Sequence, residues 1–183
     1  IDLAQAEAFM THLGEFFLGH GMNGRSGERW GNRNASMAPH GCYPALGEDR
    51  WVTIAVKDDL RWQAFCEVTG IQQKPEISTL EGRVKNREEL DALVAGWTSG
   101  LDRYESTRLL QARGIAAAPV LDCGADAYDD PHLQERGYFQ EVTHPEAGTF
   151  LLSGPLWKLH GVSAPGQTPA PCLGQHNRYA LGE

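Results

Sequence analysis

The feature that most constrains the fold of this chain is the alternation of short strand-like runs with amphipathic helical patterns between residues 38 and 122. Two apolar runs, 42–46 and 51–56, flank a turn at Gly47–Arg50 and predict a hairpin. A third run of strand length at 115–121 ends near a proline, which indicates an edge strand. Because helical patterns separate the hairpin from this third run, we predict a small α/β or α+β domain.

The helices of this region are marked by their ends. Asp58 and Asp59 precede an apolar pattern that Gly70 closes, and both acids are typical of a helix cap rather than of paired catalytic carboxylates. Asn86, followed three residues later by Glu89, resembles a capping box. Further patterns predict a helix at 104–113, a helix starting at Asp129-Asp130-Pro131, a hairpin of 139–142 with 149–152, and a last helix near 175–181.

Residues 2–20 predict a helix with an unusually broad apolar face. Leu3, Ala6, Met10, Leu13 and Phe17 recur at helical spacing, and two further phenylalanines widen the stripe. We expect Gly19-His20-Gly21 to end this helix. Such a face needs a large hydrophobic partner, so the chain by itself is expected to expose it and to self-associate, or to need its other half.

Composition excludes several classes of function. The formal net charge is −8, which argues against a nucleic acid or an anionic membrane as the partner. No run of eighteen apolar residues is present, so we predict no membrane-spanning segment. The four cysteines are scattered and the seven histidines form no metal-binding spacing, which favours free thiols, a cytoplasmic location and no metal site.

The candidate site is the loop between the first helix and the hairpin. It contains glycine and proline, which set special turns, and polar side chains that can bind an acyl group or an anion. A catalytic pair of His40 and Cys42 is the less favoured interpretation, because Cys42 opens an apolar strand and is more simply a small core residue. The predicted substrate-binding residues are Asn32, Arg33, Asn34, His40 and Gly41.

Six stretches of the chain resemble, in order, successive motifs of the class III CoA-transferases, the group of formyl-CoA transferase, carnitine CoA-transferase and α-methylacyl-CoA racemase. They include "GNR…APHG" before the hairpin, "R-x-x-N-R" before a helix, and "GIAAAPV" at the third strand. The stretches are Ile1–Ala8, Gly31–Ala45 with Trp51–Ala55, Arg83–Thr98, Gly114–Val120, Asp130–Phe139 and Pro171–Asn177.

The resemblance implies that this chain is the C-terminal portion of such an enzyme. Residues 1–30 would belong to a Rossmann-like large domain, residues 31–122 to the small α/β domain, and residues 123–183 to a return segment of the large domain. It further implies coenzyme A or acyl-CoA and a carboxylic acid as substrates, and either an interlocked homodimer or a complementary N-terminal half as partner.

In this family the nucleophilic aspartate lies upstream of the segment that Ile1-Asp2 resembles. The chain then holds no catalytic residue of its own, is expected to be inactive alone, and supplies the small-domain wall of the active site. Three alternatives stay open: part of a racemase, a non-catalytic domain that binds acyl-CoA or a partner, and a thiol hydrolase on Cys42. Ala38–Cys42 also replaces the glycine run of formyl-CoA transferases, which argues against an oxalate-type substrate.

Overall fold

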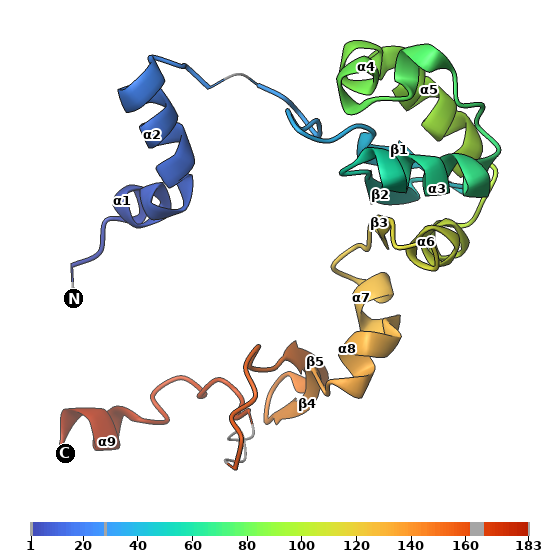
Figure 1. Ribbon diagram of the computed structural model, residues 1–183. Coiled ribbons are helices and arrows are strands. Elements are labelled where there is room, and N and C mark those ends of the chain that lie inside the picture. Colours follow the sequence, from blue (N-terminus) through green and yellow to red (C-terminus); the bar gives the residue numbers. More distant parts are fainter. Residues whose placement is uncertain (1, 28, 162–166, 183) are drawn as a thin grey trace. The chain divides into compact units, whose positions relative to one another are not determined.

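The computed structural model describes residues 2–27, 29–161 and 167–182, which form two compact units divided between Val120 and Leu121 (Figure 1). Helices and two small antiparallel sheets make up the chain, so the predicted α/β class is confirmed. The predicted boundaries at residues 30 and 122, and the Rossmann-like origin of the outer segments, stay predictions.

The first unit is built around a three-stranded antiparallel sheet of order β1-β2-β3. Its strands are β1 (His40–Pro44), β2 (Trp51–Ala55) and β3 (Ala116–Pro119). The predicted hairpin and edge strand are therefore present. However, β1 begins and ends two residues earlier than the predicted 42–46, because pairing of His40 with Ala55 and of Pro44 with Trp51 sets the register of the hairpin.

Helices α3 to α6 lie between β2 and β3 in the sequence, and side-chain caps begin three of them. They are α3 (Asp59–Thr69), α4 (Leu80–Lys85), α5 (Arg87–Thr98) and α6 (Arg103–Gln111), with a 3₁₀ turn at Pro75–Ile77. The Asp58 carboxylate accepts the backbone N–H of Arg61, and Gly70 takes the left-handed conformation, both as predicted.

The capping box predicted at Asn86 is wrong. Asn86 stands at the N-cap position of α5, but its side chain makes no cap hydrogen bond there. The amide Nδ2 instead donates to the backbone oxygens of Glu76 and Gly82, at 3.2 and 2.9 Å. Asn86 has φ −106° and ψ 33° because it also ends α4, and a capping residue normally has an extended backbone, so the helix junction overrides the local motif.

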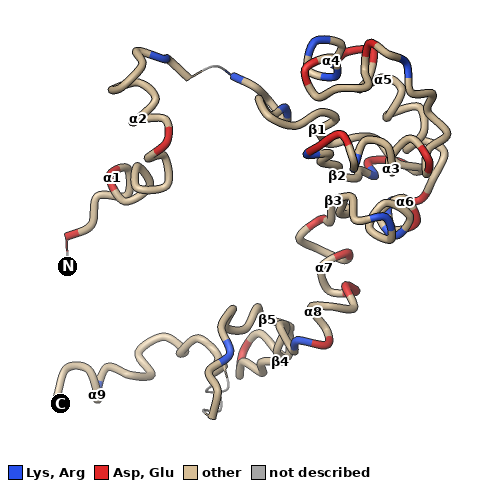
Figure 2. Tube along the Cα trace, in the orientation of Figure 1, with Lys and Arg blue, Asp and Glu red and all other residues tan. Residues whose placement is uncertain are grey.

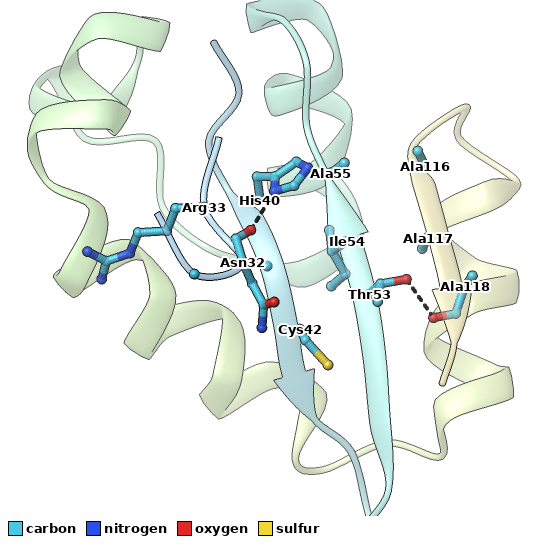
Figure 3. A pocket seen from close by; sticks show the side chains of 12 residues that line it. Asn32, Arg33, His40, Cys42, Thr53, Ile54, Ala55, Ala116, Ala117 and Ala118 are labelled. Carbon is cyan, nitrogen blue, oxygen red and sulfur yellow. Dashed lines mark hydrogen bonds between the residues drawn. The ribbon is translucent and has the colours of Figure 1, made fainter. Parts of the chain in front are cut away.

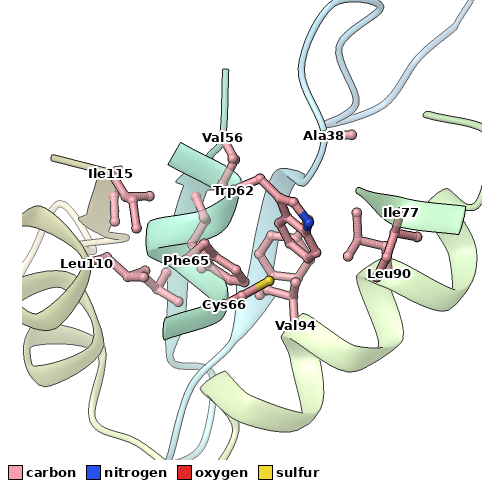
Figure 4. Packing of buried hydrophobic residues seen from close by; sticks show 14 residues of the cluster. Ala38, Val56, Trp62, Phe65, Cys66, Ile77, Leu90, Val94, Leu110 and Ile115 are labelled. Carbon is pink, nitrogen blue, oxygen red and sulfur yellow. The ribbon is translucent and has the colours of Figure 1, made fainter. Parts of the chain in front are cut away.

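One face of the sheet packs against these helices to form the hydrophobic core (Figure 4). Trp62 and Phe65 of α3 stack at its centre, with ring centroids 5.6 Å apart and planes 17° apart. Buried residues of β2, α5, α6 and the start of β3 surround them: Val52, Ile54, Leu90, Val94, Leu110, Ile115 and Ala117.

The predicted N-terminal helix is interrupted, and it begins and ends three residues later than expected. It comprises α1 (Gln5–Met10), a 3₁₀ turn at Thr11–Leu13 and α2 (Gly14–Asn23). Gly19-His20-Gly21 does not end it; Gly24 does, because this glycine takes a left-handed φ of 63° and its N–H donates to the His20 carbonyl. The predicted apolar face is exposed, with uncovered Leu3, Phe9, Met10, Phe16, Phe17, Leu18 and Met22.

The second unit contains a helix pair, a hairpin and a terminal helix. The elements are α7 (Ala125–Asp129), α8 (Pro131–Glu135), β4 (Phe139–His144), β5 (Gly148–Ser153) and α9 (Asn177–Leu181). The Asp130 carboxylate caps α8 by accepting the N–H of Leu133, as predicted, whereas Asp129 ends α7, which the sequence did not indicate.

Charges of both signs are interspersed along α3 to α6, as Figure 2 shows for α4 and α5. None of the helices in the described part of the chain combines the length and apolar character needed to cross a bilayer.

The cap at Asp58 gives acid sensitivity to the first unit. The Arg61 N–H, and then the Arg61 guanidinium, lower the pKa of Asp58. Because the pKa is lower in the folded state, this stabilisation is complete above the ordinary aspartate pKa and is lost as pH falls through the lowered folded value. We expect Asp58→Asn, which can still cap, to flatten the acid side of the curve of unfolding free energy against pH. Glu48→Gln, in the exposed β1–β2 turn, serves as control; identical curves for Asp58→Asn and the parent would contradict this.

Candidate functional site

A hollow of about 550 Å³ lies over the face of the sheet opposite the core. Its lining comes from the loop before β1 and from all three strands (Figure 3). Pockets that bind small molecules usually measure about 300–1,000 Å³, so the hollow is large enough for one. The lining residues are Gly31, Asn32, Arg33, His40–Cys42, Thr53–Ala55 and Ala116–Ala118.

The bottom of the hollow is formed by two rows of side chains that run across the sheet. Residues opposite one another in an antiparallel pair share a face. The register places His40, Ala55 and Ala116 in one row, and Cys42, Thr53 and Ala118 in the other. We call these six side chains the floor.

The His40 ring has a fixed orientation. Its Nδ1 lies 2.6 Å from the backbone oxygen of Asn32, and a carbonyl oxygen can only accept. Nδ1 therefore carries the proton, which makes Nε2 the acceptor of the neutral ring. A backbone carbonyl that fixes the histidine tautomer is a common arrangement at histidines that bind ligands or move protons.

Helix α5 holds the loop of residues 30–37 in place. The Arg87 guanidinium donates to the backbone oxygen of Asn34 and lies over the Trp30 ring, 5.2 Å from its centroid. The Asn34 side chain accepts from the N–H and hydroxyl of Ser36, which closes a turn within the loop. Asn34 thus shapes the loop, and it is not among the residues that line the hollow.

Arg33 lines the hollow with its stem, but its guanidinium points away from the floor (Figure 3). One guanidinium nitrogen lies 3.4 Å from the Asp91 carboxylate of α5. The same carboxylate accepts the Tyr43 hydroxyl at 2.8 Å. Burial and this hydrogen bond raise the pKa of Tyr43, so the phenol stays neutral.

Gly41 faces the Tyr43 ring. A Cβ at this position would lie 3.1 Å from the ring's Cζ and hydroxyl oxygen, which is tighter than ordinary contact. The lack of a side chain at Gly41 therefore makes room for Tyr43, in addition to exposing backbone at the edge of the hollow.

Cys42 lies on the floor, so its interpretation as a core residue is wrong: strand alternation turns it away from the core cluster. Burial raises the pKa of the Cys42 thiol. A nucleophilic cysteine needs a lowered pKa, so this environment opposes the thiol-hydrolase alternative.

The structure brings Asn32, His40 and Gly41 together at the hollow and directs the polar ends of Arg33 and Asn34 toward the loop and α5. Sequence reasoning missed the rest of the floor: Thr53, Ala55, Ala116 and Ala118. Period-two alternation within the run 51–56 was the available signal for Thr53 and Ala55, whereas the uniformly apolar run 115–121 offered none for the two alanines of β3. No cluster of three possible metal ligands occurs within the described ranges.

Comparisons with known proteins agree on one family. The family model of CoA-transferase family III matches residues 1–177. A probable CoA-transferase of Mycobacterium tuberculosis is 31% identical over 96% of this chain, which covers 22% of that protein. Succinyl-CoA:mesaconate CoA-transferase of Haloarcula marismortui is 30% identical over the whole chain, which covers 46% of it.

A further relative and a solved structure extend this likeness. Formyl-CoA:oxalate CoA-transferase of Streptomyces coelicolor is 30% identical over 84% of the chain and 37% of its own length. A CAIB/BAIF family protein from Brucella suis matches with a TM-score of 0.76 at 22% identity, over 93% of this chain and 44% of that one. The chain thus spans less than half the length of these proteins.

Proposed function

The chain belongs to CoA-transferase family III, and we propose that it is the C-terminal part of an enzyme that moves CoA from an acyl-CoA to a carboxylic acid. In this proposal the hollow over the sheet is one wall of the active site. The observation that carries it is His40, whose ring is fixed by the Asn32 carbonyl and lines the hollow.

The residues of the wall divide into two groups. His40, the Asn32 amide and the backbone at Gly41 contact the reacting acyl group or CoA. Arg33 and Asn34 position the loop, since their polar groups bind Asp91 and Ser36. Covering the acyl group in this way excludes water from the reactive intermediate, which otherwise hydrolyses.

The nucleophilic aspartate comes from a preceding part of the enzyme, as the family resemblance implies. The exposed apolar face of α1 and α2 is consistent with such a partner, either an N-terminal half or a second subunit. Transfer is favoured over racemisation because the curated relatives described above carry transferase names.

The test is a CoA-transfer assay on the full-length enzyme, in which the acceptor acid is isotopically labelled and the labelled acyl-CoA is quantified. We expect His40→Ala to lower kcat/KM by about 10–100-fold, because an oriented hydrogen bond to a polar or charged group is worth about 1.5–3 kcal/mol.

His132→Ala, which removes an exposed histidine of α8, is the matched control and should leave kcat/KM unchanged. Unfolding curves show whether His40→Ala keeps its fold. Full CoA transfer by a folded His40→Ala enzyme would contradict a contact role for His40, and absence of transfer by the parent enzyme with any acyl donor would contradict the proposed reaction.

A further inference from the structure

We propose that the floor binds the apolar body of an uncharged acyl group of short to medium length. This inference rests on the proposed function and names the acyl donors that the wall accepts. It uses floor residues from β2 and β3 that the sequence did not single out.

The size of the floor side chains favours a small molecule over a protein cover. Three of the six are alanines, and the others are cysteine, threonine and histidine. A second sheet packs about 10 Å away and fills the gap with interdigitating side chains from both layers. Methyl groups at Ala55, Ala116 and Ala118 leave most of that layer empty, which suits a flat or extended acyl chain.

Apart from His40 at its β1 side, the floor has no basic side chain that would bind the distal carboxylate of a dicarboxylic acyl group. The Thr53 hydroxyl donates to the Ala118 carbonyl at 3.1 Å, so its proton is already engaged. The Cys42 thiol stays neutral because burial raises its pKa. Arg33, the charged residue of the lining, contacts Asp91 instead. Burying a carboxylate on this surface would cost free energy without a compensating partner.

The polar groups of the site gather at one side, which orients the ligand. His40 and Asn32 lie at β1, whereas β3 contributes only alanines to the floor. The thioester is therefore placed at β1, and the apolar body extends across β2 to β3. Two interstrand spacings amount to about 10 Å, which limits the body to a short or medium chain.

The rate at which the Cys42 thiol is alkylated measures whether an acyl group occupies the floor. The full-length enzyme is treated with iodoacetamide, and alkylation of each cysteine is followed by peptide mass spectrometry. Hexanoyl-CoA should slow alkylation of Cys42 at least about fivefold, while succinyl-CoA at the same saturation of the enzyme should not. The exposed Cys123 is the internal control and should react equally in all samples.

Two results would overturn the proposal. Equal protection by hexanoyl-CoA and succinyl-CoA would show that the floor does not select an uncharged acyl group. Alkylation of Cys42 in the ligand-free enzyme as slow as that of the buried Cys66 would show that protein covers the floor.

A substitution tests the same surface through catalysis. Ala116→Leu should reduce kcat/KM for hexanoyl-CoA at least about tenfold more than for acetyl-CoA, because added side-chain volume displaces the longer chain. Ala112→Leu, exposed at the end of α6, is the matched control and should leave this ratio unchanged. An unchanged ratio in Ala116→Leu would overturn the proposal.

The two proposals fail in distinguishable ways. Selective protection of Cys42 without CoA transfer would retain the acyl-binding floor and remove the reaction. CoA transfer with no protection of Cys42 by hexanoyl-CoA would retain the reaction and overturn the floor.

Discussion

Replacing Arg83 by alanine is expected to lower the free energy of unfolding by about 2–5 kcal/mol, because two backbone carbonyls inside the unit lose their donor and an unsatisfied buried acceptor costs about 1–3 kcal/mol. Arg83 is 0% exposed, and its Nε donates to the Ala38 carbonyl at 2.7 Å. Its guanidinium also binds the Ser78 carbonyl at 3.2 Å and the Asp59 carboxylate at 2.9 Å. The Arg83 side chain thus connects α4 to α3 and to Ala38, which lies two residues before β1.

Chemical denaturation of the parent and the variant measures this loss. Arg113→Ala is the control, because Arg113 forms an exposed ion pair with Glu67 at 3.1 Å. Exposed pairs contribute less than about 1 kcal/mol, so this variant should unfold almost as the parent does. If Arg83→Ala lost no more than Arg113→Ala, the bridging role of Arg83 would be wrong.

Trp62→Ala is expected to destabilise the protein by about 3–5 kcal/mol, the usual cost of removing a large aromatic from a core. Trp62 is 0% exposed, stacks on Phe65, and lies beneath the Arg83 guanidinium, 5.3 Å from its ring centroid. Its loss leaves a cavity between α3 and α5. Thermal unfolding followed by circular dichroism gives the measurement, and a Tm equal to that of the parent would contradict this arrangement.

Trp62 and Arg83 are also expected to be coupled. Residues in direct contact usually show interaction energies of about 0.5–3 kcal/mol in double-mutant cycles. Trp62→Ala combined with Arg83→Ala should therefore destabilise less than the sum of the two single changes. Trp62→Ala combined with Arg113→Ala should be additive, because Arg113 contacts Glu67 instead.

Sequence patterns predicted the fold where the information is local. The caps at Asp58 and Asp130 and the stop at Gly70 depend on residues within one helical turn, and all three are present. Asn86 and Gly19–Gly21 misled for the opposite reason. The Asn86 amide donates a hydrogen bond to the end of the neighbouring helix α4. Glycine ends a helix here only where its backbone takes the left-handed conformation, as at Gly24.

The candidate site was predictable in part. Glycine, proline and polar residues marked the loop around His40, and the hollow lies there. The β3 part of the floor could not be predicted from the sequence, because Ile115–Ala118 is uniformly apolar and shows no alternation that separates the two faces of β3. Pairing with β2 decides that Ala117 enters the core while its neighbours do not, and pairing is not visible in the run itself.

The separation of the two sheet faces has an evolutionary consequence. The core contains Val52, Ile54 and Ala117 of the sheet. The residues that alternate with them along the strands, Thr53, Ala55 and Ala118, belong to the floor. Mutations at the second set change the shape of the wall without opening a cavity in the core. Under the proposed function, single codon changes at these positions would alter the acyl donor while the scaffold keeps its stability.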